Sequence, residues 1–140
     1  MSRIMAIDYG TRRVGIAVTD PHQIIATPLD TIAPEHLYAY LKEYTSTESV
    51  GQIVVGYPLK EDGSPTDLTK PVVNLLDQLR DRFPHITVTK HDERYTSKLA
   101  KQSMIAGGFS KSARRKKANL DKISATLILQ SYLEEKKVTS

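Results

Sequence analysis

The chain has 140 residues, of which 39% are hydrophobic and 26% charged, a composition typical of globular rather than disordered proteins. This length suits one domain, which we expect to cover residues 1–140. The chain holds no cysteine, which excludes disulfides, thiolate zinc sites and cysteine nucleophiles. No apolar run is longer than five residues, whereas a membrane span takes about twenty. We therefore expect a cytoplasmic protein with no membrane partner.

The first part of the chain predicts three β-strands. Apolar residues fill segments 3–8 and 14–19, and the turn-like segment 9–13 lies between them. This pattern is typical of a hairpin with a five-residue loop. A third strand is expected over residues 24–32, interrupted at Pro28.

The rest of the chain alternates helices with strands. Strands are expected at residues 50–57 and 86–91. Helices are expected after Pro34 and over residues 66–83, 96–106 and 120–133. This alternation indicates a partly parallel sheet covered by helices. The predicted class is therefore α/β, with a mixed five-stranded sheet whose opening strands are antiparallel and whose later strands are parallel.

Positive charge is concentrated in one segment. The net charge is +4, but residues 90–122 hold ten Lys or Arg residues and only three acids. The basic run 114–117 follows Gly107 and Gly108, which predicts a flexible basic loop. Such a loop could neutralise the phosphates of a nucleic acid. The alternative is a solvated surface, and we favour a face that binds polyanions.

Three carboxylates occupy positions where regular elements meet loops. Asp8 ends the first strand, Glu93 follows the last strand and Asp121 lies in the first turn of the last helix. Ligands of open α/β sheets bind near the carboxyl ends of the strands, so these acids could converge there. Carboxylates brought together repel one another, and oxygen ligands suit one or two Mg²⁺ or Mn²⁺ ions. The pattern predicts a metal site that cuts phosphodiester bonds inside a basic rim.

Each of these acids also has an ordinary structural interpretation. Asp121 would complement the dipole of its helix. Glu93 would pair with Arg94 or Lys90 at the surface. Asp8 would cap its turn. The residue pattern alone leaves these interpretations open.

Four blocks of sequence closely resemble the bacterial YqgF/RuvX family. They are segments 7–11 with 14–18, segment 55–59, segment 91–94, and Asp121 with Ser124 and Ala125. They occur in the family's order and cover nearly the whole chain. The resemblance implies a ribonuclease H-like fold, related to RuvC-type Holliday junction resolvases.

The same resemblance implies an activity and a site. The family is described both as a junction resolvase and as a nuclease that matures the 5′ end of pre-16S rRNA. The family's acidic positions fall on Asp8, Glu93 and Asp121, as catalytic residues and as ligands of Mg²⁺ or Mn²⁺. The resolvases carry two acids three residues apart on the last helix, whereas Ala118 and Ser124 flank Asp121 here. We therefore expect an ester-bond hydrolase acting on RNA in ribosome biogenesis, with ribosomal precursor particles among its partners. A monomer is favoured, with a dimer left open.

A wider set of residues is expected to contact nucleic acid. Gly10 and Gly56 would let the backbone pass close to the site or to a phosphate. Thr96 and Ser97 could contact phosphate or cap the following helix. Asp92 is assigned to local hydrogen bonding, and His91 to packing first and proton shuttling second. The complete nucleic-acid set is Gly10, Thr11, Arg12, Gly56, Lys60, Arg94, Thr96, Ser97, Arg114, Arg115, Lys116 and Lys117.

Three other functions stay open at this point. The main alternative is a Holliday junction resolvase acting on DNA. A phosphotransferase is a second alternative, because Asp8, Gly10 and Thr11 followed by Gly15 resemble the first phosphate loop of the actin, hexokinase and Hsp70 ATPases. The chain is too short for their two lobes. The last alternative is a non-catalytic RNA-binding protein, which the basic loop favours and the three acids oppose.

Overall fold

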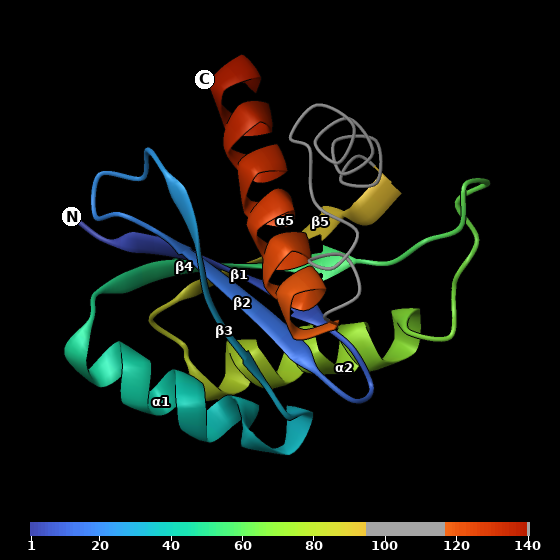
Figure 1. The fold of residues 1–140 in the computed structure, drawn as a ribbon, viewed down its shortest axis with the longest axis horizontal. Helices are drawn as coiled ribbons and strands as arrows, with labels where there is room; N and C mark the ends of the chain where they lie inside the picture. The colour runs from blue at the N-terminus through green and yellow to red at the C-terminus, as the bar shows by residue number, and fades with distance from the viewer. Residues whose placement is uncertain (95–116, 140) are drawn as a thin grey trace.

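A computed structural model describes residues 1–94 and 117–139 of the chain. Five strands form one sheet in the order β3-β2-β1-β4-β5, and helices cover both of its faces (Figure 1). The short 3-10 helix η1 (Pro34–His36) leads directly into the first α-helix. The other elements are β1 (Arg3–Tyr9), β2 (Val14–Thr19), β3 (Ala26–Ile32), α1 (Leu37–Thr47), β4 (Val50–Tyr57), α2 (Thr69–Arg82), β5 (Thr87–Asp92) and α5 (Lys117–Thr139).

Strand β1 is the centre of the sheet. It pairs antiparallel with β2 and parallel with β4. Strand β3 continues the antiparallel side, and β5 continues the parallel side. The predicted mixed sheet, with an opening hairpin and later parallel strands, is confirmed.

The expected interruption at Pro28 is wrong. Strand β3 runs through this residue, which is level with Ala17 of β2, and a register shift lies between Ile16 and Ala17. Because β3 is an edge strand, one side of its backbone has no neighbouring strand, and proline is tolerated at such an edge.

The helices differ from their predicted ranges mainly at their ends. Helix α2 begins at Thr69 rather than at residue 66, so Pro71 lies in the first turn, where its missing N–H is not needed. Helix α5 is longer than the predicted 120–133 at both ends. The helix expected over 96–106 lies outside the described residues. No helix in the described part of the chain combines the length and apolar character of a membrane span.

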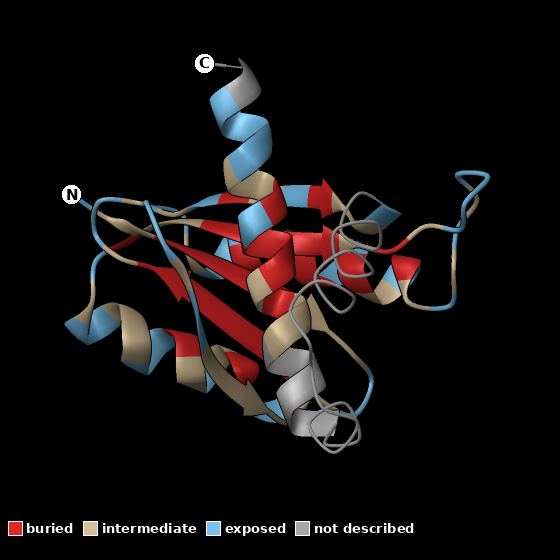
Figure 2. Cartoon of the chain, turned by 45° about the horizontal axis from the view of Figure 1, so that its top comes forward, coloured by how far each residue is buried: buried red, intermediate tan, exposed pale blue. Residues whose placement is uncertain are grey.

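Two hydrophobic cores lie on opposite faces of the sheet. One is built between the strands and helices α1 and α2, with Ile7, Ile53 and Leu41 at its centre. The other lies under α5, where Ala125 and Ile128 and their neighbours contact small strand residues. Figure 2 shows the buried central strands between these layers. Because both faces are covered, β1 and β4 are almost continuously apolar until they reach their carboxyl ends.

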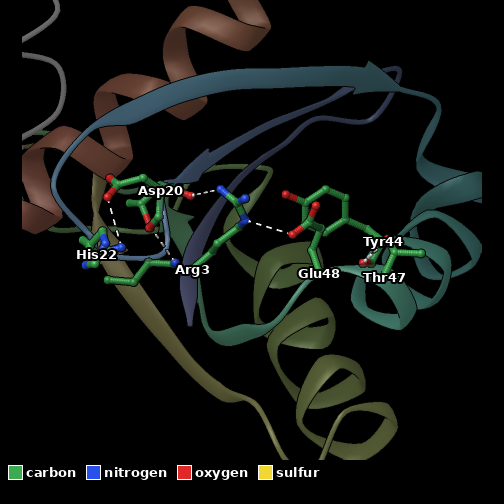
Figure 3. Close-up of polar contacts among 8 residues, drawn as sticks. Arg3, Asp20, His22, Tyr44, Thr47 and Glu48 are labelled. Carbon is green, nitrogen blue, oxygen red and sulfur yellow. Dashed lines mark hydrogen bonds and ion pairs between the residues drawn. The ribbon is translucent and has the colours of Figure 1, made fainter. Parts of the chain in front are cut away.

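The amino end of β1 is tied to its neighbours by complementary polar groups (Figure 3). The guanidinium of Arg3 places Nε 3.3 Å from Glu48 Oε2, and its Nη1 donates to the Thr19 carbonyl at 3.0 Å. The Thr19 hydroxyl accepts a hydrogen bond from the Ile4 N–H at 2.9 Å. Each charge at this end therefore meets a partner that stabilises it.

Asp20, which follows β2, organises the next loop at the same end. Its carboxylate accepts backbone N–H bonds from His22, Ile24 and Ile25 at 2.7–3.0 Å. These bonds, that of Ile25 first, hold the pKa of Asp20 below its ordinary value. The charged form of this carboxylate is the one that the fold stabilises.

Candidate active site

Asp8 lies near the carboxyl end of the central strand. Two residues before it, Ala6 packs under helix α5 and is level with Val54 of β4. Since side chains alternate along a strand, Asp8 and Gly56 continue this pair on the same face of the sheet. The sheet face beneath α5 is therefore apolar at Ala6 and Val54, and it carries Asp8 and Gly56 near the carboxyl ends of β1 and β4.

Glu93 brings a second carboxylate to this place. It directly follows β5, and its side chain lies against Gly56. A Cβ at position 56 would be 2.5 Å from Glu93 Oε1 and 2.7 Å from Ile128 Cδ1 of helix α5. Glycine therefore makes room for this carboxylate between the sheet and the helix. The contact of Gly56 with nucleic acid stays a prediction.

Asp8 and Glu93 form a side-chain hydrogen bond, which requires that one carboxyl group carry a proton. Burial, then the negative charge of Asp8 and the hydrogen bond to it, raises the pKa of Glu93 to about 8 from its ordinary 4.5. Near neutral pH, the pair therefore keeps a shared proton. A cation bound between the two carboxylates would reduce their repulsion and favour the loss of this proton.

Asp92, next to Glu93, has a different environment. It accepts hydrogen bonds from the Arg94 backbone N at 2.9 Å and from its Nη2 at 2.6 Å. These hydrogen bonds, the side-chain ones first, hold the pKa of Asp92 below its ordinary value. Asp92 thus has the local role expected of it, and it holds the guanidinium of Arg94 in place. The same guanidinium approaches Gly63 of the loop between β4 and α2.

A cavity of about 320 Å³ lies at the edge strand β5. In it, the Lys90 ammonium lies 4.5 Å from the centre of the Tyr57 ring. The cavity therefore combines a positive charge and an aromatic surface with the carboxylates of Asp92 and Glu135. The lining residues are Tyr57, Leu59, Lys90, His91, Asp92 and Glu135.

Two surface loops carry further residues expected to bind nucleic acid. In the loop between β1 and β2, Gly10 N donates to the Arg13 carbonyl at 2.9 Å, and a Cβ on Gly10 would lie 2.7 Å from that oxygen. The turn itself therefore requires a glycine at this position. Thr11 and Arg12 are exposed in the same loop, and Lys60 is exposed in the loop that follows β4. Their contacts with nucleic acid stay predictions.

The structure leaves part of the predicted site untested. The backbone of Asp121 and Lys117 belongs to helix α5, but their side chains lie outside the described ones. Among the side chains that are described, no three His, Cys, Asp or Glu residues gather to hold a metal ion. Five predicted residues lie outside the described ranges altogether: Thr96, Ser97, Arg114, Arg115 and Lys116.

Sequence reasoning missed two partners of this region on helix α5. Ile128 closes over Gly56 and the carboxylate of Glu93. Ser131, one turn later, contacts the buried His91. The only signal in the sequence is that position 131 interrupts the apolar stripe of α5 with a small polar residue, and this signal does not name the partner.

Comparison with known proteins identifies the family of this chain. A family model described as "RuvX: Holliday junction resolvase" matches residues 2–135. The chain belongs to the RuvX family. A relative from Amoebophilus asiaticus is 50% identical over 137 residues, covering 98% of this chain and 97% of the relative. One from Phocaeicola vulgatus is 47% identical, covering 98% and 99%. Both carry the name "Putative pre-16S rRNA nuclease".

Solved structures support the fold of this RuvX family member. RuvC of T. thermophilus in complex with a Holliday junction substrate is similar with a TM-score of 0.57 and 12% sequence identity, covering 96% of each chain. A second structure of Thermus thermophilus RuvC gives a TM-score of 0.50. The predicted ribonuclease H-like fold is confirmed.

Proposed function

We propose that this RuvX family member is a metal-dependent nuclease that acts in the cytoplasm and processes the 5′ end of pre-16S rRNA. The observation that carries this proposal is the Asp8–Glu93 pair, two carboxylates held together at the carboxyl ends of the strands. The nuclease class follows from the RuvX family, the RuvC-like fold and the names of the relatives, which support a hydrolase acting on ester bonds of nucleic acid.

The chemistry of these two side chains fits a divalent cation. Asp8 and Glu93 supply oxygen ligands, which suit Mg²⁺ or Mn²⁺, and a cation between them would offset the mutual repulsion that helps to raise the pKa of Glu93. One or two such ions, when bound, would make a water molecule more acidic and stabilise the charge on the leaving oxygen. The protein's own part is to hold its carboxylates rigidly between sheet and helix, with Gly56 providing the space.

Asp121 is proposed as the third ligand. It belongs to helix α5, one turn before Ala125, which packs on the sheet, and two turns before Ile128, which contacts the Gly56 position. Residues four and seven apart share a face of a helix. This spacing supports Asp121 as the third ligand.

The basic residues around this pair are proposed to hold the phosphate chain. Arg94 is oriented by Asp92 beside Glu93, and Lys60 and Arg12 are exposed in neighbouring loops. The run 114–117 would add affinity for nucleic acid of any sequence, because contacts to phosphate carry no base information.

Replacing the four residues 114–117 by alanine should flatten the salt dependence of binding. The slope of the logarithm of the binding constant against the logarithm of the salt concentration should change by about 0.7 per lost contact for a single strand. An unchanged slope would make the run a solvated surface.

RNA is the proposed substrate, and the DNA junction is the second candidate. The relatives' printed names favour precursor rRNA, and the acid three residues from Asp121 that RuvC-type resolvases carry is replaced by Ala118 or Ser124. The family description and the solved complex of RuvC favour the junction. A resolvase must cut two strands symmetrically, which calls for a two-fold dimer, whereas a monomer suffices to cut a single strand.

The test compares a precursor 16S rRNA leader with a synthetic four-way junction at equal enzyme and Mn²⁺ concentrations. We expect cleavage of the leader, its loss in EDTA and its return with added Mn²⁺. Cleavage that continues unchanged in EDTA would contradict the metal proposal. Symmetric cleavage of the junction, with the leader intact, would contradict the choice of RNA.

A further inference from the structure

A buried histidine joins β5 to helix α5, two residues before Glu93. His91 is 4% exposed. Its Nε2 lies 2.8 Å from the hydroxyl of Ser131, and its Nδ1 lies 3.1 Å from Glu135 Oε2. Both partners belong to α5, one turn apart. One imidazole therefore holds two successive turns of this helix.

A second set of contacts extends the link to β4. The Gln52 amide donates to the Tyr132 hydroxyl at 2.7 Å and to the Thr89 hydroxyl at 3.0 Å. The Tyr132 ring also stands perpendicular to the His91 ring, with 6.1 Å between their centres. Two successive turns of α5 are thus contacted from both parallel strands, β4 and β5.

The remaining contacts of α5 cannot define its position as sharply. The core beneath it is made largely of small and aliphatic side chains such as Ala6, Ala17 and Ala125. Apolar burial is not directional and depends mainly on area, so a small slide of the helix would cost little of it. Hydrogen bonds weaken steeply when their distances and angles change. The polar link at His91 is therefore the part of the interface that defines the register of the helix.

We infer that His91 is a positioning residue, which fixes the register of helix α5 on the sheet and thereby brings Asp121 to the Asp8–Glu93 pair. This inference rests on the proposed function, which gives Asp121 its part. One end of the link is on the strand that delivers Glu93, and the other is on the helix that carries Asp121. A slip of one turn would move position 121 by about 5.4 Å along the helix axis, which would remove it from a shared cation.

The order Ser131–His91–Glu135 is also that of a hydrolase triad. The surroundings favour a positioning role instead. Ser131 is only 9% exposed and lies within a helix. The neighbouring cavity reaches His91 and Glu135 on the other side of the imidazole from the serine hydroxyl. A substrate in that cavity would meet the imidazole and the acid rather than a nucleophile.

The register of α5 can be measured directly, because the natural chain contains no cysteine. Spin labels on cysteines introduced at the exposed positions Asp77 of α2 and Gln130 of α5 report the distance between the two helices by pulsed electron paramagnetic resonance. The His91→Ala variant should give a broadened or shifted distance distribution, whereas the parent should give one narrow distribution. The full chain is used throughout.

Two further variants separate positioning from general loss of stability. Leu41→Ala removes a fully buried side chain from the core on the opposite face, and it should destabilise the protein without changing the label distances. His91→Gln keeps an amide that can contact the Ser131 hydroxyl, and it should restore part of the narrow distribution. An unchanged distribution in His91→Ala, or an equal change in Leu41→Ala, would overturn the inference.

The metal requirement provides a second readout. We expect His91→Ala to raise the Mn²⁺ concentration for half-maximal cleavage by about tenfold, as is usual when a residue supporting metal ligands is lost. The affinity for RNA in Ca²⁺ should stay within about twofold of the parent, since His91 is buried. Equal Mn²⁺ requirements in the His91→Ala and Leu41→Ala variants would contradict the inference. A parent protein that cleaves nothing would contradict the proposed function instead, while the label distances would still decide the position of the helix.

Discussion

Charged side chains have opposite environments at the two ends of the central strand β1. At the amino end, Arg3 meets Glu48, and Asp20 accepts backbone N–H groups that hold its pKa below the ordinary value. At the carboxyl end, Asp8 and Glu93 are pressed together, and the pKa of Glu93 is raised to about 8. The same strand thus begins among oppositely charged and hydrogen-bonded groups and ends in a pair of like-charged groups.

This difference separates a structural cluster from a candidate functional one. Complementary groups stabilise the folded chain in the charge state that they already have. Two partly buried carboxylates in contact do not, and they persist only because the surrounding sheet and helix hold them in place. Like-charged groups kept together at such a position indicate a site that is completed by a ligand of opposite charge.

The largest expected effect comes from removing one carboxylate of the pair. Glu93→Gln should lower the rate of RNA cleavage by at least about 100-fold, because a metal ligand is lost. It should leave the free energy of unfolding equal to or greater than that of the parent, since the repulsion with Asp8 is also lost. The matched control is Asp20→Asn at the other end, which should lower stability and leave cleavage unchanged. Cleavage rates and urea unfolding of both variants test the comparison.

The second effect is a pH dependence of stability in the absence of metal. Glu93 binds its proton more tightly in the folded chain, with a pKa of about 8 against 4.5. The free energy of unfolding should therefore fall as the pH rises from about 4.5 through 8, by about 2–4 kcal/mol relative to Glu93→Gln. Added Mg²⁺ should reduce this fall. Parallel pH profiles of the parent and Glu93→Gln would show that the carboxylate is not perturbed.

The two glycines of β4 sharpen the comparison further. A Cβ at Gly56 would collide with the Glu93 carboxylate and with Ile128. Gly56→Ala should therefore cost about 1–3 kcal/mol of stability and lower the cleavage rate as well. Gly51 lies at the opposite end of the same strand, where a Cβ would meet the side chain of Ser2 near the chain terminus. Gly51→Ala should cost less and leave cleavage intact, because that side chain can turn away.

The smallest effect is expected at the amino end of β1 itself. Glu48→Gln removes the charge that faces Arg3, in a pair whose side chains are 43% and 25% exposed. Such partly exposed pairs contribute about 0.2–1 kcal/mol. Thermal unfolding at low and high salt should show a small loss that disappears with added salt. A loss of several kcal/mol would mean that this end is as sensitive as the carboxylate end.

The elements that the sequence predicts best are the buried strands. Val14–Thr19 and Val50–Tyr57 were expected at their observed bounds, because uninterrupted apolar segments between turn residues are typical of buried strands. Pro28 misled the prediction, since a proline ends a central strand but not an edge strand, and the edge position follows only from the completed sheet.

The candidate site could be predicted in part, because its acids stand out from their basic surroundings. That Asp8 and Glu93 meet at all depends on the order of strands in space, which places β4 between β1 and β5. The link of His91 to Ser131 joins residues 40 positions apart, and the polar residue in the apolar stripe of α5 does not name its partner. The third acid, Asp121, stays a prediction.

The position of α5 in the chain has a consequence for the order in which the protein can fold. This helix follows every strand, yet it covers the second face of the sheet and contacts β1, β2, β3 and β4. A growing chain that has completed β5 still exposes Ile4 and Val54 to water, and hydrophobic surface of this kind promotes aggregation. The carboxylates also lack their cover until Ile128 arrives. The packing of α5 on the sheet therefore covers the exposed apolar face and completes the carboxylate site in a single late step of folding.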